Sequence, residues 1–242
     1  MKNTNSLLFF SIAFVIASFL LSDAIINRNS TDDKIWVKGL GKTNFFSDLI
    51  VWKGSFTRKN FELQAAYKQL DSDRKIIKAY LSENGIDESQ LIFEAVDINK
   101  EYNYLYNKNG QSNRNFEGYR LTQEIKIESK EVDKIEALSR KVTDLINKGL
   151  EFYSKPPQYY YTGLADLKLE MIAAATEDAR LRAEKIAENS NSSLGNLKNA
   201  RMGVFQITAQ NSNEDYSWGG SYNTYSKKKT ASITMTLEYE VD

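Results

Sequence analysis

The alternation of apolar and polar residues predicts most of the strands of this chain. The stretches IWVKGLG (residues 35–41) and DLIVWKGSFTR (48–58) alternate and are rich in β-branched and aromatic residues, which are typical of strands. Residues 101–118 favour a long hairpin connection, with Asn109-Gly110 as its turn. By the same alternation, further strands are expected over about residues 90–98, 118–129, 150–155, 199–210 and 230–241.

Apolar residues at helical spacing predict three main helices. The first runs over about residues 61–83 and stops at Gly85, because glycine tolerates the left-handed turn at a helix end. The second begins after Ser129 and ends near Gly149. The third, about residues 164–190, has an apolar stripe rich in alanine, which indicates close approach to a sheet or to a neighbouring helix.

The order of these elements predicts the fold class. Strands and helices mix without a strict β-α alternation, and the hairpins imply antiparallel pairing. We therefore expect an α+β fold: a mixed, largely antiparallel sheet with three main helices packed on one face, preceded by an amino-terminal hydrophobic helix. The α+β domain is expected to span residues 34–242.

The amino terminus predicts the compartment. Residues 7–21 are LLFFSIAFVIASFLL, with Lys2 before them and Asp23 after them. Such a run is typical of a signal-peptide core or of a short membrane helix. Residues 1–27 are therefore either an uncleaved anchor, which we favour, or a cleaved signal, followed by a polar tether over 28–33. In both cases the folded part is expected outside the cytoplasm, on the periplasmic or cell-surface side.

Composition removes most catalytic and metal chemistry. The chain has no cysteine and no histidine, which excludes disulfides and thiolate sites and removes the commonest general base and zinc ligand. Basic and acidic residues both number 32, so the neutral chain lacks the positive field that attracts nucleic acid. We expect no enzyme activity, no cofactor, no metal and no nucleic-acid partner.

Two short motifs resemble ligand sites and have simpler explanations. GLGKT (residues 39–43) matches the end of a phosphate-binding loop, but Trp36 stands where that loop requires glycine, and no helix pattern follows. A glycine-bearing bend between two strands is expected instead. Asp71 and Asp73 lie two residues apart on the first helix, so they point in different directions and are expected on a solvated face.

Aromatic residues gather in three segments that are expected to be loops. Exposed rings with polar tips suit protein interfaces or stacking on carbohydrate. Such rings are equally consistent with strand ends that contact no ligand. The candidate interface or ligand-contact residues are Tyr102, Tyr104, Tyr106, Tyr159, Tyr160, Tyr161, Tyr216, Trp218 and Tyr222.

Several stretches, taken in order, carry a resemblance to a known family. They are VKGLG (37–41), DLIVW (48–52), YNYLY (102–106), GYRLTQEIKIES (118–129), AAATEDARLRAEKIAENSNSSLG (173–195) and KKTASITMTLEYEV (228–241). Together they resemble the SIMPL-domain family of extracytoplasmic proteins, which are related to periplasmic immunogenic and oxidative-stress defence proteins. With the upstream apolar segment, the chain is similar to the membrane-anchored branch of that family.

The resemblance implies an α+β domain, no known catalytic residues, no established ligand, and a tendency among relatives to form large homo-oligomers. We therefore expect a non-enzymatic, membrane-tethered protein that self-associates and supports cell-envelope or stress homeostasis. The alternative is a module that binds glycans or cell-wall fragments through its Tyr- and Trp-rich loops. An envelope protein or a glycan is a possible partner, and the resemblance identifies no particular one.

Overall fold

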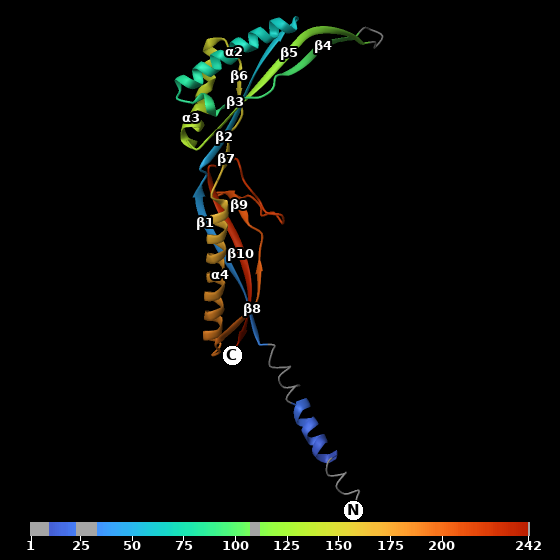
Figure 1. Cartoon of the computed structure of the whole chain (residues 1–242), viewed down its shortest axis with the longest axis vertical. Helices are drawn as coiled ribbons and strands as arrows, with labels where there is room; N and C mark the ends of the chain where they lie inside the picture. Colours follow the sequence, from blue (N-terminus) through green and yellow to red (C-terminus); the bar gives the residue numbers. More distant parts are fainter. Residues whose placement is uncertain (1–9, 23–32, 107–111, 242) are drawn as a thin grey trace, which may run out of the picture.

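The computed structural model describes residues 10–22, 33–106 and 112–241, and it confirms an α+β fold with antiparallel sheets. Figure 1 shows an elongated molecule with a six-stranded sheet towards one end and a four-stranded sheet towards the other. The strands therefore form two sheets, whereas one was expected, and the three main helices are divided between them. We call these two parts the six-stranded half and the four-stranded half.

The six-stranded half is built around two long paired strands, β2 (Leu49–Asn60) and β5 (Ser112–Ser129). β5 also pairs with β3 (Leu91–Phe93) and β4 (Asp97–Tyr106), and β2 also pairs with β6 (Phe152–Ser154) and β7 (Gln158–Tyr160). One face of the sheet packs against α2 (Leu63–Glu83), α3 (Val132–Lys141) and the 3₁₀ turn η2 (Val142–Lys148); a second 3₁₀ turn, η1 (Glu88–Gln90), precedes β3.

The core of the six-stranded half consists of large side chains. Trp52 and Phe56 of β2 alternate onto the same face as Leu121 and Ile127 of β5, and all four are fully buried. Ile77 of α2 packs into the same cluster. Burial of large apolar side chains stabilises this half by roughly 1.5–3 kcal/mol for each of them.

The four-stranded half has a different core. Its strands are β1 (Lys34–Phe46), β8 (Leu194–Met202), β9 (Gln206–Ala209) and β10 (Lys228–Val241), with β10 pairing to the other three. Its single helix is α4 (Leu164–Asn189), which lies along β1 and β10 (Figure 1). Ala175, Ala179 and Ala183 of α4 are fully buried against this sheet, as the alanine-rich stripe predicts.

The GLGKT motif lies inside strand β1, and the expected bend between two strands is wrong. Gly39 and Gly41 face α4 so closely that a Cβ atom on Gly39 would lie 2.1 Å from the Ala175 carbonyl oxygen. A Cβ atom on Gly41 would lie 2.4 Å from the Met171 carbonyl oxygen. Glycine on the strand and alanine on the helix therefore allow the two backbones to pack in direct contact.

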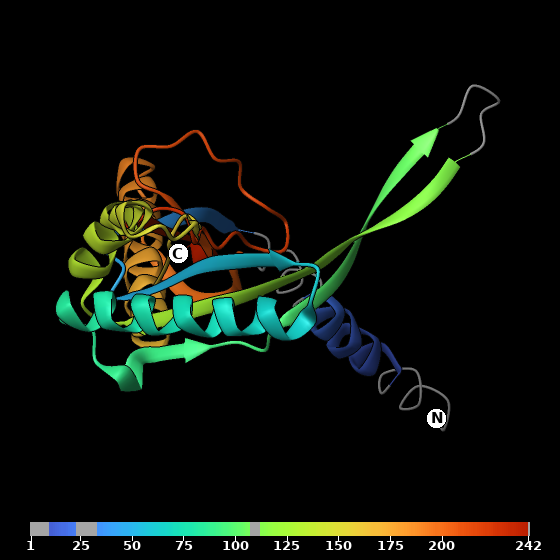
Figure 2. The ribbon, with the colours of Figure 1, turned by 90° about the horizontal axis from the view of Figure 1, so that it is seen from above.

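Two segments differ from their predicted secondary structure. Residues 101–118 belong largely to β4 and β5, which form a long hairpin that extends away from the body (Figure 2). The expected turn at Asn109-Gly110 lies outside the described residues. The predicted strand at 150–155 is confirmed only as the short β6, and a second short strand, β7, resumes after Pro156-Pro157.

The pair Asp71 and Asp73 separates as the helical geometry requires. Asp71 lies on the solvated face and pairs with Arg74 and Lys75. Asp73 is only 4% exposed, so its expected place on a solvated face is wrong. The Arg58 guanidinium donates two hydrogen bonds to its carboxylate, of 2.5 and 2.8 Å, and these satisfy the buried charge.

The expected hydrophobic helix at the amino terminus is present over residues 10–22, and all of its residues are exposed. The predicted anchor or signal covers residues 1–27, of which only this helix falls within the described part. Among the helices that the structure describes, none is both long enough and apolar enough to cross a membrane.

Candidate interaction surfaces

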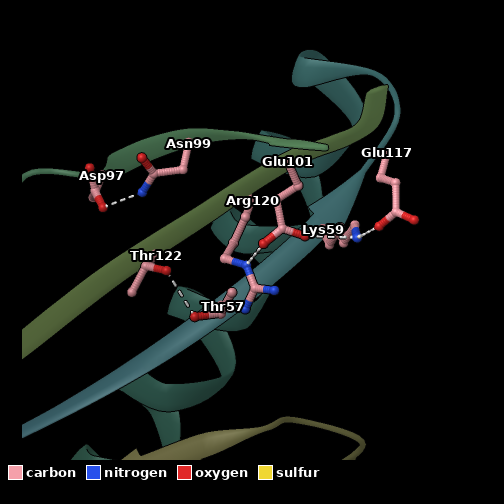
Figure 3. A network of polar contacts seen from close by, with 8 residues as sticks. All are labelled: Thr57, Lys59, Asp97, Asn99, Glu101, Glu117, Arg120 and Thr122. Carbon is pink, nitrogen blue, oxygen red and sulfur yellow. Dashed lines mark hydrogen bonds and ion pairs between the residues drawn. The ribbon is translucent and has the colours of Figure 1, made fainter. Parts of the chain in front are cut away.

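Helices cover one face of each sheet and leave the other face open. The two open faces differ in chemistry. On the six-stranded half the open face is polar: Thr57 of β2 hydrogen-bonds Thr122 of β5 at 3.0 Å (Figure 3). Lys59 pairs with Glu101 at 2.7 Å, and Arg120 pairs with the same carboxylate. The hydrogen bond from Arg120, followed by that from Lys59, lowers the pKa of Glu101 to about 2.

The β4–β5 hairpin carries the first group of candidate aromatics. The Arg114 guanidinium lies 3.5 Å from the Tyr102 ring centroid, and the Phe116 ring lies 5.7 Å from the same ring. Tyr104 is 51% exposed further along β4. Tyr102, Tyr104 and Arg114 border a shallow hollow of about 460 Å³ with charged walls. Tyr106 ends β4, and its side chain lies outside the described part.

The open face of the four-stranded half bears an apolar groove of about 500 Å³. Leu40 of β1 and Thr234 of β10 form its floor, because both side chains point away from α4. Val204, Tyr216 and Trp218 form its walls. Trp218 is 97% exposed, so nearly the whole indole ring is available to a partner. The sequence signal for Leu40 was its alternation with Gly39 and Gly41.

The loop that carries Tyr216 and Trp218 is held on the sheet by one buried polar side chain. The Gln206 Nε2 atom donates to the Ser217 carbonyl oxygen at 2.7 Å. Its Oε1 atom accepts hydrogen bonds from the amides of Ser217 and Ser221 and from the Ser221 hydroxyl. The Ser232 hydroxyl donates to the Tyr216 Oη atom at 3.3 Å. The groove therefore has a wall of fixed backbone, and sequence reasoning missed Gln206 because an isolated glutamine carries no pattern.

The remaining candidate aromatics lie where the two halves meet. Tyr159 is buried in the core of the six-stranded half, so it is not an exposed ring. Tyr161 is half-buried, with its ring 4.8 Å from that of Phe45. Tyr160 lies 6.4 Å from Tyr222 between ring centroids, although the two are distant in sequence. The structure thus brings together Tyr160 with Tyr222 and Tyr216 with Trp218. The β4–β5 hairpin, which carries the remaining candidate tyrosines, lies apart from β7 and β9 (Figure 1).

Two lysines fasten the segment that connects the groove loop to β10. The Lys227 ammonium contacts Asp133 at 2.5 Å and Glu136 at 2.9 Å, and these hydrogen bonds raise its pKa to about 12. The Lys229 side chain is 0% exposed and donates to the carbonyl oxygens of Asn223 and Ser226 at 2.5 Å each. Burial lowers the pKa of Lys229 to about 8.

Acidic side chains do not gather into a metal site within the described ranges: no three of them converge so as to hold an ion. The surfaces described above are instead built from aromatic rings, hydroxyl groups and paired charges, which are suited to non-covalent recognition.

Comparison with known protein families gives a match over most of the chain. The model of the SIMPL family, described as a protein of unknown function (DUF541), matches residues 35–240, which is most of the chain. No curated protein matches the chain.

Proposed function

We propose that this protein has a non-enzymatic role and is tethered to a membrane. The chain belongs to the SIMPL family, whose function is unknown. In this proposal the body lies outside the cytoplasm, self-associates, and supports cell-envelope or stress homeostasis. The observation that carries self-association is the exposed β4–β5 hairpin. The observation that carries the tether is the exposed apolar helix at residues 10–22.

The hairpin supports self-association because it has too little support of its own. A two-stranded ribbon is marginally stable in water unless another surface covers one of its faces. Beyond the body, the described residues of β4 and β5 pair only with each other (Figure 2). Tyr104 and Phe116 nevertheless expose apolar surface along it, and Ile98 exposes more where β4 joins the body. A second copy of the chain that packs against this ribbon would cover those side chains.

Light scattering coupled to size exclusion tests this on the full chain in detergent. We expect an assembly larger than one chain per micelle. The double variant Ile98→Ser with Tyr104→Ser should shift it towards the monomer, because it removes apolar area from the hairpin. Tyr225→Ser is the matched control, since Tyr225 is exposed but lies away from the hairpin. A strict monomer at every concentration contradicts self-association.

Translation into membrane vesicles tests the tether. We expect full-length protein to resist alkaline extraction and its body to be protected from added protease. A charge-bearing variant, Phe14→Asp with Ile16→Asp, should return the protein to the supernatant, because aspartate inside an apolar span is strongly disfavoured. A shortened mass would identify a cleaved signal in place of an anchor. Protease digestion of the body in sealed vesicles contradicts an extracytoplasmic location.

The groove beside Trp218 favours a second candidate function, the binding of glycans or cell-wall fragments. An exposed indole, the Tyr216 ring and the hydroxyls of Ser217 and Thr234 offer one stacking surface with hydrogen-bonding groups around it. A glycan array compared between the natural chain and the triple variant of Tyr216, Trp218 and Tyr222 to alanine tests it. Signals lost only in the variant support a glycan site, and identical profiles remove the idea.

A further inference from the structure

Strand β1 has an unpaired edge. It hydrogen-bonds β10 along its length, and no other strand among the described residues lies beside it. The Leu40 amide points away from β10, because it donates to the Asp178 Oδ2 atom of α4 at 2.8 Å. Backbone groups alternate in direction along a strand, so those of Trp36 and Lys38 point to the same free edge. Within the described ranges, neither of these two amides has a hydrogen-bond partner.

A groove of about 580 Å³ runs along this edge. One wall is β1 at Trp36, Val37 and Lys38. The other wall is α4, at Leu181, Arg182, Lys185 and Ile186. Leu181 and Ile186 are exposed apolar side chains on the flank of the helix. The groove therefore lies between an edge strand and a helix, where an extended peptide can join the sheet.

The charged side chains that line the groove, Lys38, Arg182 and Lys185, are all basic. Arg182 pairs with Asp178, and Lys185 pairs with Glu188. Lys38 has no acidic partner in the described part of the chain, and Lys42 further along the same face has none either. Lysine and apolar residues alternate on the outward face of β1, as Lys34, Trp36, Lys38, Leu40 and Lys42. A complementary strand would place carboxylates beside Lys38 and apolar side chains beside Leu181 and Ile186.

We propose that the free edge of β1 between Trp36 and Lys38 is a strand-addition site for an extended, acidic peptide segment of another protein. The amides and carbonyls of Trp36 and Lys38 hydrogen-bond the backbone of that segment. Its side chains alternate between the apolar flank of α4 and the lysine-bearing face of β1. The Asp178–Leu40 contact occupies the next outward amide and so closes the site at that end. This site is separate from the hairpin and from the Trp218 groove.

Binding of synthetic peptides to the full chain in uncharged lipid nanodiscs tests the proposal by fluorescence anisotropy. The probe is a labelled, acetylated octapeptide of alternating valine and glutamate. We expect saturable binding by this peptide, weaker binding when glutamine replaces glutamate, and none when lysine does. N-methylation of alternate residues separates strand pairing from simple charge attraction. One N-methylated set should lose binding and the other should keep it, because only one set of peptide amides faces β1.

Substitutions on the protein side place the binding at this edge. Trp36→Pro removes an outward amide without breaking the ladder to β10, and it should weaken binding roughly tenfold. Lys38→Ala should weaken it about threefold, as expected for one exposed charge pair. Lys68→Ala, an exposed lysine on α2, is the matched control and should leave binding unchanged. If Trp36→Pro does not fold, the two N-methylated peptides still decide the question on the natural chain.

Hydrogen exchange distinguishes the occupants of the edge. Peptide binding should slow exchange at the amides of Trp36 and Lys38. Slowing that depends on protein concentration without peptide identifies a second copy as the occupant and overturns the proposal. Equal binding of both N-methylated peptides, or no binding of the valine–glutamate peptide, overturns it as well. These results leave self-association through the hairpin untouched, since the hairpin variants report on that separately.

Discussion

In both halves of this molecule, helices pack on one face of a sheet. The side chains between helix and sheet differ in size: large in the six-stranded half, and small where α4 meets β1 in the four-stranded half. The six-stranded half keeps its helices at a distance with large residues such as Trp52 and Phe56. The four-stranded half brings α4 into contact with β1 by placing Gly39 opposite Ala175 and Ala179. The first core depends on large side chains that fill it, and the second on the absence of a Cβ atom at Gly39. Each is therefore expected to fail by the opposite kind of substitution.

The open faces extend this contrast to recognition. On the six-stranded half, threonines pair across β2 and β5, and charged side chains pair across β2, β5 and β4 (Figure 3). On the four-stranded half, Leu40 and Trp218 leave an apolar groove exposed. A face whose polar groups are already paired offers little free energy to a partner, whereas exposed apolar area offers more. Of the two open sheet faces, that of the four-stranded half is thus the better suited to docking.

The largest expected effect is in the six-stranded core. Phe56→Ala should lower the free energy of unfolding by about 4 kcal/mol, because it removes a fully buried ring and leaves a cavity. Urea denaturation of the full chain in detergent measures it. The control is Phe46→Ala, since Phe46 is exposed on β1 and should change stability by less than about 0.5 kcal/mol. Equal losses in the two variants would contradict the assignment of Phe56 to a filled core.

The next effect comes from adding one methyl group to the four-stranded core. Gly39→Ala should lower the free energy of unfolding by about 3 kcal/mol, because the new Cβ meets the α4 backbone, which cannot move aside. Gly54→Ala is the matched variant in the other half. There the new Cβ meets the Cζ atom of Phe152, 2.1 Å away, and this side chain can move aside by rotation about its Cα–Cβ bond. We expect the smaller loss at Gly54, and the reverse order in urea denaturation would overturn the contrast between the two cores.

Sequence patterns predicted the elements of both halves better than their assembly. Alternation and helical spacing identify β1, β2, α2 and α4, because these signals are local. They do not identify strand partners: β1 pairs with β10 from the opposite end of the chain, and this choice divides the strands into two sheets. The GLGKT glycines were interpreted as a bend because the helix that requires them lies more than a hundred residues away.

The candidate site was predicted only in part, for similar reasons. Trp218 and Tyr216 are exposed, as their polar, glycine-rich surroundings indicate. Tyr159 belongs to the same kind of aromatic cluster but is buried, because β7 pairs it with Ile50 of β2. Composition cannot distinguish these cases, since burial depends on which strand becomes the neighbour.

A smaller effect on stability is expected from Lys229, in the segment that connects the groove loop to β10. Lys229 is buried, whereas the neighbouring Lys227 pairs with two carboxylates. The pKa of Lys229 is lowered to about 8 by burial, below its unfolded value, so the unfolded state binds more protons above pH 8. Stability should therefore rise by about 1 kcal/mol between pH 7 and pH 9. Lys229→Met should remove this rise, and urea denaturation at several pH values measures it. Lys227→Met is the control, because its pKa is raised to about 12 and it does not titrate in this window. A rise that persists in Lys229→Met would assign the pH dependence to another group.

The smallest effect is expected at the residue that matters most for the second candidate function. Trp218→Ala should change the free energy of unfolding by less than about 0.5 kcal/mol, because the indole ring is almost fully exposed and supports no core. In the same measurement, Trp52→Ala should lower the free energy of unfolding by about 4 kcal/mol, because Trp52 is buried. Such a result would support the proposed glycan site, because a ring that contributes nothing to folding remains available to a partner. A large loss of stability in Trp218→Ala would instead make the ring part of the fold and would weaken the case for a groove that is open to a partner.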